Sequence, residues 1–288
     1  MNILLFSRRT VYETAVRDVR SGRLKKLIQC GHRSVKSLKR AHTEHQRTLE
    51  HVEALLGKLG FSHRLVYDLR GVKAERFDLV MTVGGDGTVL YASHHVASDP
   101  PMFGVNSSPS TSAGYLTSAD RGNLKEKLLN LRQGKIRRST LQRLTVALDD
   151  ELVHDRVLND VLFASHCQAV PARYCLRIGR IEEEQMSSGI WIGPAAGSTA
   201  AILSAGGRRL PTGSKKIQFV VREPVRRPGC RLTSGVVGQG EKIVILNKWQ
   251  RAKIFVDGPH HRAPVEPGQR ITVQASDSPL VLLGWRRR

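Results

Sequence analysis

The sequence predicts a parallel α/β domain followed by a mostly antiparallel β domain. Over roughly the first 120 residues, short apolar runs of strand length alternate with helical patterns, as in folds with a parallel sheet. Beyond them, many short β-like runs are separated by Gly, Pro and charged turns. The last run, "PLVLLGW", has the length of a strand that returns to the first domain. We therefore expect an α/β domain over 1–120, a β-rich domain over 121–270 and a C-terminal segment, 271–288, packed on the first domain.

The spacing of apolar residues gives the elements of the first domain. The run "NILLF" predicts the first strand, and a basic stretch without clear periodicity then extends to about His42. The helical stripe that follows consists of Leu49, Val52, Leu55, Leu56 and Leu59. Gly60 is the expected end of this helix, because glycine adopts the conformation that closes helices. We expect the next strand in "HRLVYDL".

A second strand–helix–strand unit follows. The continuous apolar run "FDLVMTV" (77–83) predicts a strand buried on both faces. We expect a helix in "TVLYASHHVA" from near Thr88 and a further buried strand in "PMFGVN" (101–106). Strands that alternate with helices in this way give a Rossmann-like parallel sheet.

The second domain begins with one helix and continues with strands. "LKEKLLNLRQGK" has helical spacing, and later runs such as "RLTVAL", "RVLNDVLFA", "RYCLRIG", "KIQFVV" and "RITVQA" have strand length. No zinc spacing occurs among the four cysteines, and we expect free thiols in the cytoplasm. No apolar run approaches the length of a membrane span, and the N-terminus lacks the features of a signal peptide.

The charge of the chain is unusual. Lys and Arg number 46 against 25 Asp and Glu, which gives a formal net charge of +21. Such an excess attracts polyanions, such as nucleic acid or a phosphate-rich small substrate, and is also consistent with an arginine-rich surface that binds polyanions nonspecifically. The segment Arg8–Arg47 is strongly basic, but Tyr12 is its one aromatic residue, so it lacks a stacking platform for single strands. We interpret this segment as a solvated face, and likewise the histidines His42, His45 and His51 of the helical stretch that overlaps its end.

The stretch "VGGDGTVL" (83–90) is the strongest candidate for a functional turn. It follows a buried parallel strand, and ligands bind at that edge of open α/β sheets. Gly84, Gly85 and Gly87 allow positive φ and close approach to a ligand, and the following helix N-terminus suits phosphate. A carboxylate is out of place there unless Asp86 positions a hydroxyl, accepts its proton or helps to hold Mg²⁺. A tight turn with a capping Asp is the structural alternative.

Other phosphate-binding motifs are absent from the sequence. There is no G-x-x-x-x-G-K-[ST], no protein-kinase catalytic loop and no G-x-G-x-x-G after a strand. The run "GGDGT" instead resembles the motif shared by NAD kinases, diacylglycerol and sphingosine kinases and, more distantly, phosphofructokinases. Lipid kinases usually continue this motif into an Asn-Glu pair, whereas this chain continues "VLYASHH".

Three further segments select the NAD kinase family. "GVNSSPSTSAGYLT" (104–117), "VLNDVLFA" (157–164) and "AAGSTAAILSAGG" (195–207) resemble that family's motifs in order and spacing over nearly the whole chain. The resemblance implies transfer of the γ-phosphate of ATP to the 2′-hydroxyl of the adenosine ribose of NAD⁺ or NADH. Asp86 matches the catalytic aspartate, and the adjoining glycines, Thr88 and Asn106 match residues that line the substrates.

The resemblance also implies a dinucleotide site in the β domain. Asn159 and Asp160 match the pair that binds the adenosine portion, and an amide beside a carboxylate can read both donors and acceptors. The small-residue loop against which the dinucleotide lies corresponds to Gly197, Ser198, Thr199, Ala200 and Ser204. Arg173 is a candidate for the dinucleotide phosphates. We interpret Asp257-Gly258 as a hairpin turn.

Two departures from the common pattern point to one branch of the family. Ser188 stands where an Asp commonly precedes the Gly of "GIWIG", and Ala201 replaces a common Tyr. Together with "IQFVVREP" (217–224), they resemble the plant-type NADH kinases and their bacterial relatives. Because oxidised nicotinamide is cationic and the reduced ring is neutral, loss of a carboxylate should weaken selection for NAD⁺. We therefore expect NADH to be used at least as well as NAD⁺.

Several alternatives stay open at this point. The phosphoryl donor is ATP by default, with inorganic polyphosphate as the alternative, and the divalent cation is Mg²⁺ or another. The family usually forms homodimers or tetramers. The rival functions are a lipid kinase that shares GGDGT and a basic nucleic-acid-binding protein on an inactive kinase fold.

Overall fold

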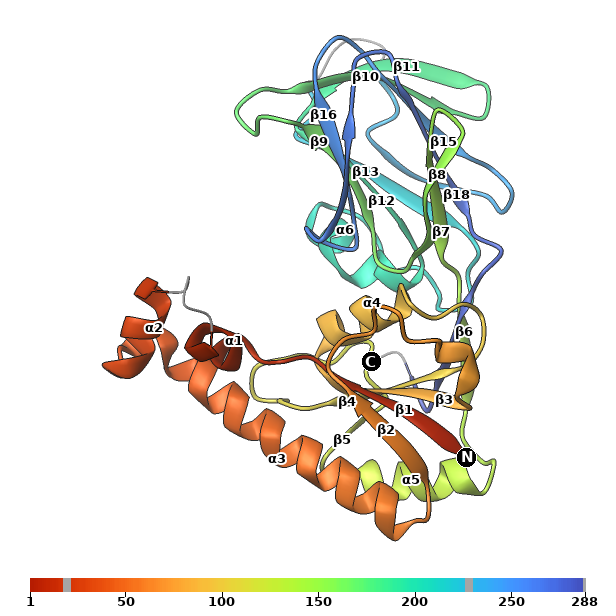
Figure 1. Cartoon of the computed structure of the whole chain (residues 1–288). Helices are drawn as coiled ribbons and strands as arrows, with labels where there is room; N and C mark the ends of the chain where they lie inside the picture. Colours follow the sequence, from red (N-terminus) through yellow and green to blue (C-terminus); the bar gives the residue numbers. More distant parts are fainter. Residues whose placement is uncertain (18–21, 226–229, 287–288) are drawn as a thin grey trace. The chain divides into compact units, whose positions relative to one another are not determined.

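The computed structural model describes residues 1–17, 22–225 and 230–286, and these form two compact units. The first unit contains Met1–Ser139 and Val281–Arg288, and the second contains Thr140–Leu280 (Figure 1). The change of unit lies at 139/140 rather than at 120/121, because the helix Leu124–Arg132 buries Leu124 and Leu128 in the core of the first unit. The arginines at 287 and 288 and part of the basic segment, residues 18–21, lie outside the described residues.

The first unit is built on a sheet in which β1 to β5 and β19 pair in parallel. Its strands follow the order β2-β1-β3-β4-β19-β6, and the short β5 pairs with β4. Their bounds are β1 Asn2–Ser7, β2 Ser62–Val66, β3 Leu79–Gly84, β4 Met102–Asn106, β5 Ala119–Asp120, β6 Arg138–Leu141 and β19 Leu280–Leu283. All six residues of β3 are buried, which confirms a strand covered on both faces. The final strand β19 runs parallel to β4, with Leu282 opposite Met102, so the predicted return of the last strand is confirmed. The return begins at Val281 rather than at 271, because β18 pairs with β7 and β15 in the second unit.

Helices cover this sheet and extend beyond it. The helices are α1 Val11–Arg17, α2 Gly22–Gln29, α3 Lys36–Lys58, α4 Asp86–Ser93 and α5 Leu124–Arg132, with the 3₁₀ turns η1 Arg33–Val35 and η2 Ala74–Arg76. The predicted stripe of α3 is buried from Leu49 to Leu56, and Gly60 follows with a φ of +73°. None of the described helices is long and apolar enough to cross a membrane.

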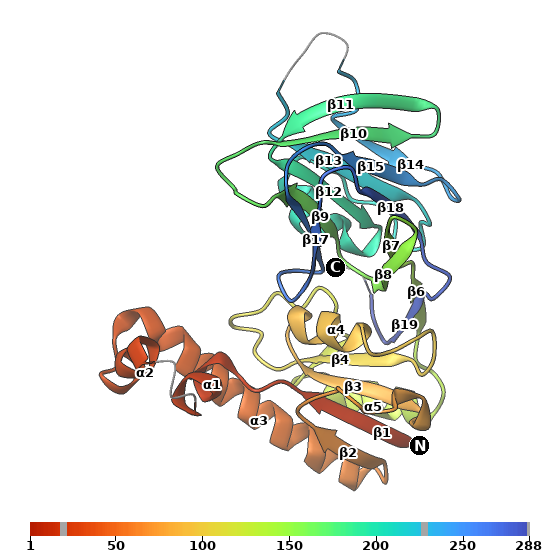
Figure 2. The ribbon, with the colours of Figure 1, turned by 45° about the horizontal axis from the view of Figure 1, so that its top comes forward.

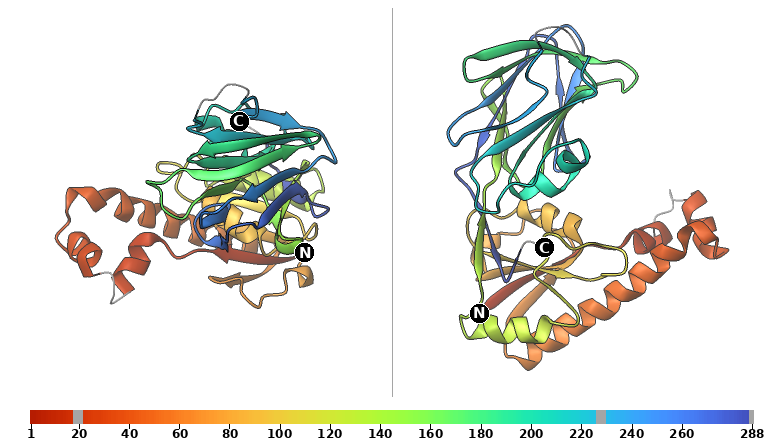
Figure 3. Two further views of the ribbon diagram at one scale, coloured as in Figure 1. Left: turned by 90° about the horizontal axis from the view of Figure 1, so that it is seen from above. Right: turned by 180° about the vertical axis from the view of Figure 1, so that it is seen from behind.

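The basic stretch before His42 is helical, contrary to the expectation from its weak periodicity. α3 begins at Lys36, and α1 and α2 lie at the N-terminal end of α3, beyond the sheet (Figures 1 and 3). α2 buries none of its residues and α1 buries only Ala15. We call α1, α2, η1 and the first two turns of α3 the helical arm. A signal was present in α2, because Leu24, Leu27 and Ile28 have helical spacing.

The second unit is a sandwich of two antiparallel sheets (Figure 2). One sheet has the order β11-β10-β15-β18-β7-β8 and the other the order β14-β13-β12-β9-β16-β17. The strands of the first sheet are β7 Leu144–Leu148, β8 Glu151–Val157, β10 Ala172–Ile178, β11 Ile181–Ser187, β15 Ile243–Asn247 and β18 Arg270–Ala275. Those of the second are β9 Val161–Ser165, β12 Gly189–Pro194, β13 Ile217–Arg222, β14 Ser234–Val237, β16 Ala252–Val256 and β17 His261–Val265. The short η3 Ala196–Thr199 and α6 Ala201–Ser204 follow β12. The predicted fold class is thus confirmed.

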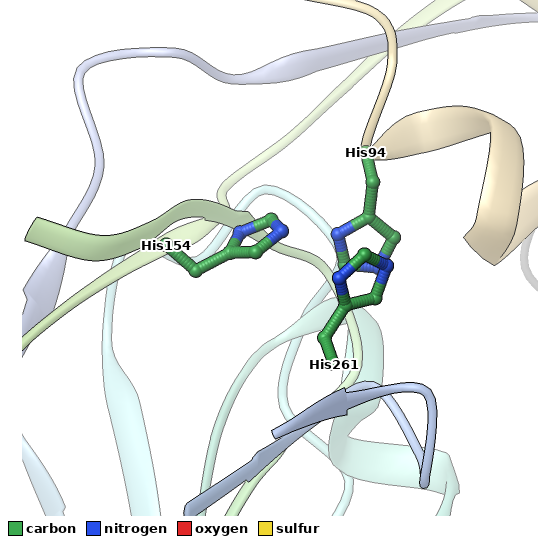
Figure 4. Close-up of side chains that lie close together, drawn as sticks. All are labelled: His94, His154 and His261. Atoms are coloured by element: carbon green, nitrogen blue, oxygen red, sulfur yellow. The ribbon is translucent and has the colours of Figure 1, made fainter. Parts of the chain in front are cut away.

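The edges of the sandwich carry the strands that sequence patterns missed. β11, "IEEEQMS", is an edge strand whose side chains are mostly polar, so it has no apolar signal. The run "RVLNDVLFA" is two strands, β8 and β9, broken at Leu158–Asp160. At the opposite edge, His154 on β8 and His261 on β17 face each other with ring centroids 5.2 Å apart, so the two sheets meet there (Figure 4).

Candidate active site

The glycine–aspartate turn joins β3 to α4 in the first unit. Gly84 ends the strand, Gly85 is the N-cap residue and Asp86 is the first residue of the helix, two residues earlier than expected. The carboxylate of Asp86 therefore lies at a helix N-terminus, where backbone N–H groups and the helix dipole stabilise negative charge. It is half-buried.

None of the three glycines in this turn has a positive φ, so that expectation was wrong. Gly84 and Gly85 are needed for close packing instead. A Cβ atom on Gly84 would lie 2.1 Å from Thr88 Oγ1, and one on Gly85 would lie 2.6 Å from Ser112 Oγ. A Cβ atom on Gly87 would meet nothing within 4 Å. The first two glycines thus let Thr88 and the segment around Ser112 close over the turn.

Both carboxylate oxygens of Asp86 accept backbone hydrogen bonds. Oδ1 accepts from Leu116 N at 2.7 Å and Oδ2 accepts from Tyr115 N at 3.0 Å. Each carboxylate oxygen has a second lone pair, so the group can still accept a proton or bind a cation. The two N–H groups fix the orientation of the carboxylate, as an aligned acceptor requires.

The segment from Asn106 to Thr117, which supplies these two N–H groups, is folded around Asn106. The Asn106 side chain is buried, donates to Ser112 O at 3.0 Å and accepts from Ser108 N at 3.2 Å. Gly114 turns with a φ of +68° beside that amide. The structure therefore places the predicted ligand-binding Asn106 where it shapes the segment that orients Asp86.

Residues on α3 that sequence reasoning did not select hold the same segment. Glu44 accepts hydrogen bonds from Ser108 Oγ and Ser110 Oγ at 2.7 Å each. Thr48 Oγ1 donates to Ser107 O at 3.0 Å. The hydroxyls of Ser108 and Ser110 hold the pKa of Glu44 below its ordinary value, which favours the ionised carboxylate. We call Glu44, His45 and Thr48, the residues of α3 that hold this segment, the clamp.

His45 is the third residue of this clamp. Its side chain is buried and its ring nitrogens contact Ser7 Oγ at 3.0 Å and Ser107 Oγ at 2.8 Å. Burial lowers its pKa, which favours the neutral ring. The expectation of a solvated face was wrong for His45, and a signal was present, because His45 lies four residues before Leu49 on the buried stripe of α3.

In the second unit, the break between β8 and β9 carries Asn159 and Asp160. The carboxylate of Asp257, at the end of β16, accepts the backbone N–H groups of Leu158, Asn159 and Asp160 at 2.8, 2.7 and 2.9 Å. Asn159 Nδ2 also donates to Asp160 Oδ2 at 3.0 Å. Asp257 is therefore more than a hairpin residue: it fixes the backbone on which the predicted adenosine-binding pair stands.

Asp160 has the most perturbed carboxyl group of this set. Its side chain is buried, and burial followed by the charge of Asp257 raises the pKa of Asp160 to about 7. Near neutral pH this carboxyl can therefore donate a hydrogen bond as well as accept one. Perturbed groups of this kind gather at functional sites, although buried networks in general produce them too.

The glycine-rich loop packs directly on that pair. A Cβ atom on Gly197 would lie 1.5 Å from Asn159 O, so no larger residue fits. The buried hydroxyl of Ser198 donates to Ala195 O at 2.8 Å and accepts from Leu210 N at 2.9 Å, which fixes the loop. Thr199 and Ala200 are half-buried and Ser204 is exposed, so these three remain accessible.

The two remaining predicted residues lie elsewhere in the second unit. Ser188 precedes β12, is half-buried, and pairs through its backbone with Arg222 O at 3.0 Å. Arg173 lies on β10, on the face opposite the buried Ala172 and Tyr174. Its guanidinium lies over the ring of Trp249, 5.5 Å from the centroid. β10 belongs to the sheet that contains β8, whereas Gly197 follows β12 of the other sheet.

Comparison with known proteins identifies the family. The profile of the ATP-NAD kinase N-terminal domain matches residues 7–136, which is most of the first unit. The chain is 33% identical over 227 residues to a probable NADH kinase of Oryza sativa subsp. japonica, a match that covers 71% of this chain and 70% of that protein. The chain belongs to the NAD kinase family. An NADH kinase of Arabidopsis thaliana is 32% identical over 227 residues, 71% of each chain, so the resemblance to the plant NADH kinase branch is confirmed.

The fold of the NAD kinase family is also found in the structural comparison. A crystal structure of an NAD kinase from Archaeoglobus fulgidus in complex with ATP matches with a TM-score of 0.68 at 21% identity, over 100% of this chain and 94% of that one. At this identity the match supports the fold. Membership of the NAD kinase family makes this protein a kinase, and the lipid-kinase and inactive-fold alternatives lose their basis.

Proposed function

We propose that this kinase transfers the γ-phosphate of ATP to the 2′-hydroxyl of the adenosine ribose of NADH and NAD⁺. The names of its plant relatives support the dinucleotide, and the ATP complex of the archaeal structure supports the donor. The observation that carries the proposal is the carboxylate of Asp86, aligned by Tyr115 N and Leu116 N at the start of α4. A secondary alcohol is a weak nucleophile, and an oriented carboxylate compensates for this.

The proposed reaction assigns Asp86 a defined step. The ribose 2′-oxygen attacks the γ-phosphorus, its proton passes to the Asp86 carboxylate, and the bond from the γ-phosphorus to the β–γ bridging oxygen breaks to release ADP. Phosphoryl transfer depends mostly on alignment and charge neutralisation. The fixed orientation of Asp86 and the N–H groups at the start of α4 meet these two needs.

A divalent cation would arrive with ATP. Mg²⁺ prefers oxygen ligands and is usually held by one or two carboxylates together with the substrate phosphates. Among the described residues, no group of three or more carboxylates has its oxygens close enough to form a metal site by itself. Asp86, with a free lone pair on each oxygen, fits the role of the single protein carboxylate, and Mg²⁺ would neutralise phosphate charge.

For the dinucleotide, we assign Asn159 and Asp160 to the adenosine and the loop Gly197–Ala200 to a close-packed wall. The support is the rigid contact between Asn159 and Gly197 and the three N–H groups held by Asp257. Ser188 in place of a carboxylate favours the neutral reduced ring. Arg173 stays a candidate for the dinucleotide phosphates, and its guanidinium lies over Trp249 on the face of β10 opposite the buried Ala172 and Tyr174.

The test is an assay of the purified protein with ATP, Mg²⁺ and either NAD⁺ or NADH, with NADP(H) measured by a coupled enzyme. We expect product from both, with kcat/KM for NADH equal to or above that for NAD⁺. Asp86→Asn keeps one of the two backbone hydrogen bonds, turns an amide N–H2 group toward the other backbone N–H, and should lower turnover by roughly a hundredfold or more. Near-normal turnover of Asp86→Asn would remove the residue from its role. If NADP(H) formed with polyphosphate and not with ATP, polyphosphate would be the phosphoryl donor in place of ATP.

A further inference from the structure

The helical arm contains a cavity that the kinase reaction does not use. The cavity has a volume of about 320 Å³ and lies between α1, α2, η1 and the first turns of α3. Its size is within the range of small-ligand sites, which is roughly 300–1,000 Å³. All of its lining residues belong to the first unit.

The lining of this cavity combines an apolar surface with positive charge. Tyr12 on α1, Ile28 on α2 and Val35 on η1 supply apolar surface from three elements. Lys36, Lys39 and Arg40 supply three cations from one face of α3, since they are three and four residues apart. None of the described residues that line the cavity is acidic.

Two of these cations have no acidic partner. In the part of the chain that the structure describes, Lys36 and Lys39 take part in no ion pair, and both are exposed. Arg40 pairs with Glu44 at 3.2 Å. Cations beside an apolar cavity attract a ligand of opposite charge, and the low polarity of the walls strengthens that attraction.

Arg40 links the cavity to the segment that orients Asp86. Glu44 accepts from Arg40 Nε at 3.2 Å and also holds Ser108 and Ser110. An anion in the cavity that engages Arg40 would compete with Glu44 for the guanidinium. The clamp on the segment Asn106–Thr117 would then change, because Glu44 would keep the serines as its remaining partners.

We propose that this cavity binds a small amphipathic anion, with a hydrocarbon body against Tyr12, Ile28 and Val35 and a phosphate or carboxylate head on Lys36, Lys39 and Arg40. The apolar lining excludes a purely polar anion as the preferred ligand, since its head alone would leave that lining in water. The ligand is a free molecule rather than a membrane lipid, because a volume of about 320 Å³ accommodates one short hydrocarbon chain.

The experiment measures binding of decyl phosphate to the full chain by isothermal titration calorimetry below its micellar concentration. We expect one site per chain, weak or absent binding of decan-1-ol, and none of inorganic phosphate alone. Lys36→Ala/Lys39→Ala should raise the Kd by at least about tenfold, which corresponds to about 1.4 kcal/mol. Ile28→Ser should weaken binding without removing any charge.

The matched control is Lys25→Ala/Lys26→Ala, which removes the same charge from α2 without touching the cavity lining. Its affinity should equal that of the wild type, and circular dichroism should show that every variant keeps its helices. Equal affinity of Lys36→Ala/Lys39→Ala, decan-1-ol as strong as decyl phosphate, or binding only to phosphatidylglycerol vesicles would each overturn the proposal. Amide exchange at Tyr115 and Leu116 should change when decyl phosphate is bound, and no change would remove the link through Arg40.

Discussion

Asp257 Oδ1 accepts the backbone N–H group of Asn159 at 2.7 Å, across 98 positions of sequence. The same carboxylate also accepts from Leu158 and Asp160, and Asp257 reaches them from a backbone with a φ of +49°. One side chain thus replaces the strand hydrogen bonds that are lost where β8 ends and β9 begins. The predicted adenosine-binding pair is held by a residue that need not touch the substrate.

The first prediction concerns this positioning role. In Asp257→Asn one side-chain oxygen can still accept the backbone N–H groups, but the amide N–H2 group points toward another backbone N–H. The unpaired donors should destabilise this turn by about 1–3 kcal/mol. We expect the KM for the dinucleotide to rise by about tenfold or more while kcat changes less. The measurement is steady-state kinetics together with calorimetric binding of the dinucleotide. Asp150→Asn is the control, because Asp150 also has a positive φ but lies in an exposed turn. A kcat loss at constant KM would contradict the assignment.

The second prediction concerns pH. The pKa of Asp160 is about 7 in the folded protein, well above the 3.8 of an exposed Asp. Between these values the folded state keeps a proton that the unfolded state has lost, so the stability contributed by Asp160 falls as pH rises from about 4 to 7. Asp160→Asn should remove this component. The measurement is the free energy of unfolding of the wild type and of Asp160→Asn at several pH values. If the two free energies changed in parallel with pH, Asp160 would be ionised in the folded protein throughout this range.

The helices and strands could be predicted from the sequence where their buried residues recur with a regular spacing. β3, α3 and β19 were readable because their buried residues form continuous or helical patterns. β11 was not readable, because it is a polar edge strand whose structure depends on its neighbour in the sheet. The helical arm was missed although Leu24, Leu27 and Ile28 of α2 have helical spacing.

The residues of the candidate site also fall into those that the sequence could predict and those that it could not. Asp86, Asn159 and Gly197 could be selected because their motifs are contiguous in sequence. Glu44, His45 and Asp257 could not be placed, since each acts on a segment far along the chain through hydrogen bonds to Ser107, Ser108 or backbone N–H groups. Only the position of His45 on a buried stripe gave any local sign of such a contact.

The third prediction uses the contact of Gly197 with Asn159. A methyl group at Gly197 would lie 1.5 Å from Asn159 O, so Gly197→Ala must displace one of the two segments. We expect dinucleotide affinity to fall by tenfold or more, about 1.4 kcal/mol, with a lower melting temperature. Gly213→Ala is the control, because a Cβ atom there meets nothing within 4 Å. Unchanged binding by Gly197→Ala would separate this loop from the dinucleotide site.

The last prediction concerns the choice between NAD⁺ and NADH, and it depends on charge alone. Ser188 is half-buried just before β12, and its backbone is fixed by the hydrogen bond to Arg222 O. A carboxylate about 4 Å from a cation in a partly solvated site contributes up to about 4 kcal/mol. Because Ser188 is only half-buried, solvent and salt screen most of this energy, and about 1.4 kcal/mol corresponds to a tenfold change. Ser188→Asp should raise the ratio of kcat/KM for NAD⁺ to that for NADH by about this factor. Ser188→Asn has nearly the same shape without the charge and should leave the ratio unchanged. If both variants moved the ratio equally, the size of the side chain and not its charge would decide the preference, and the absence of a carboxylate would no longer explain the use of NADH.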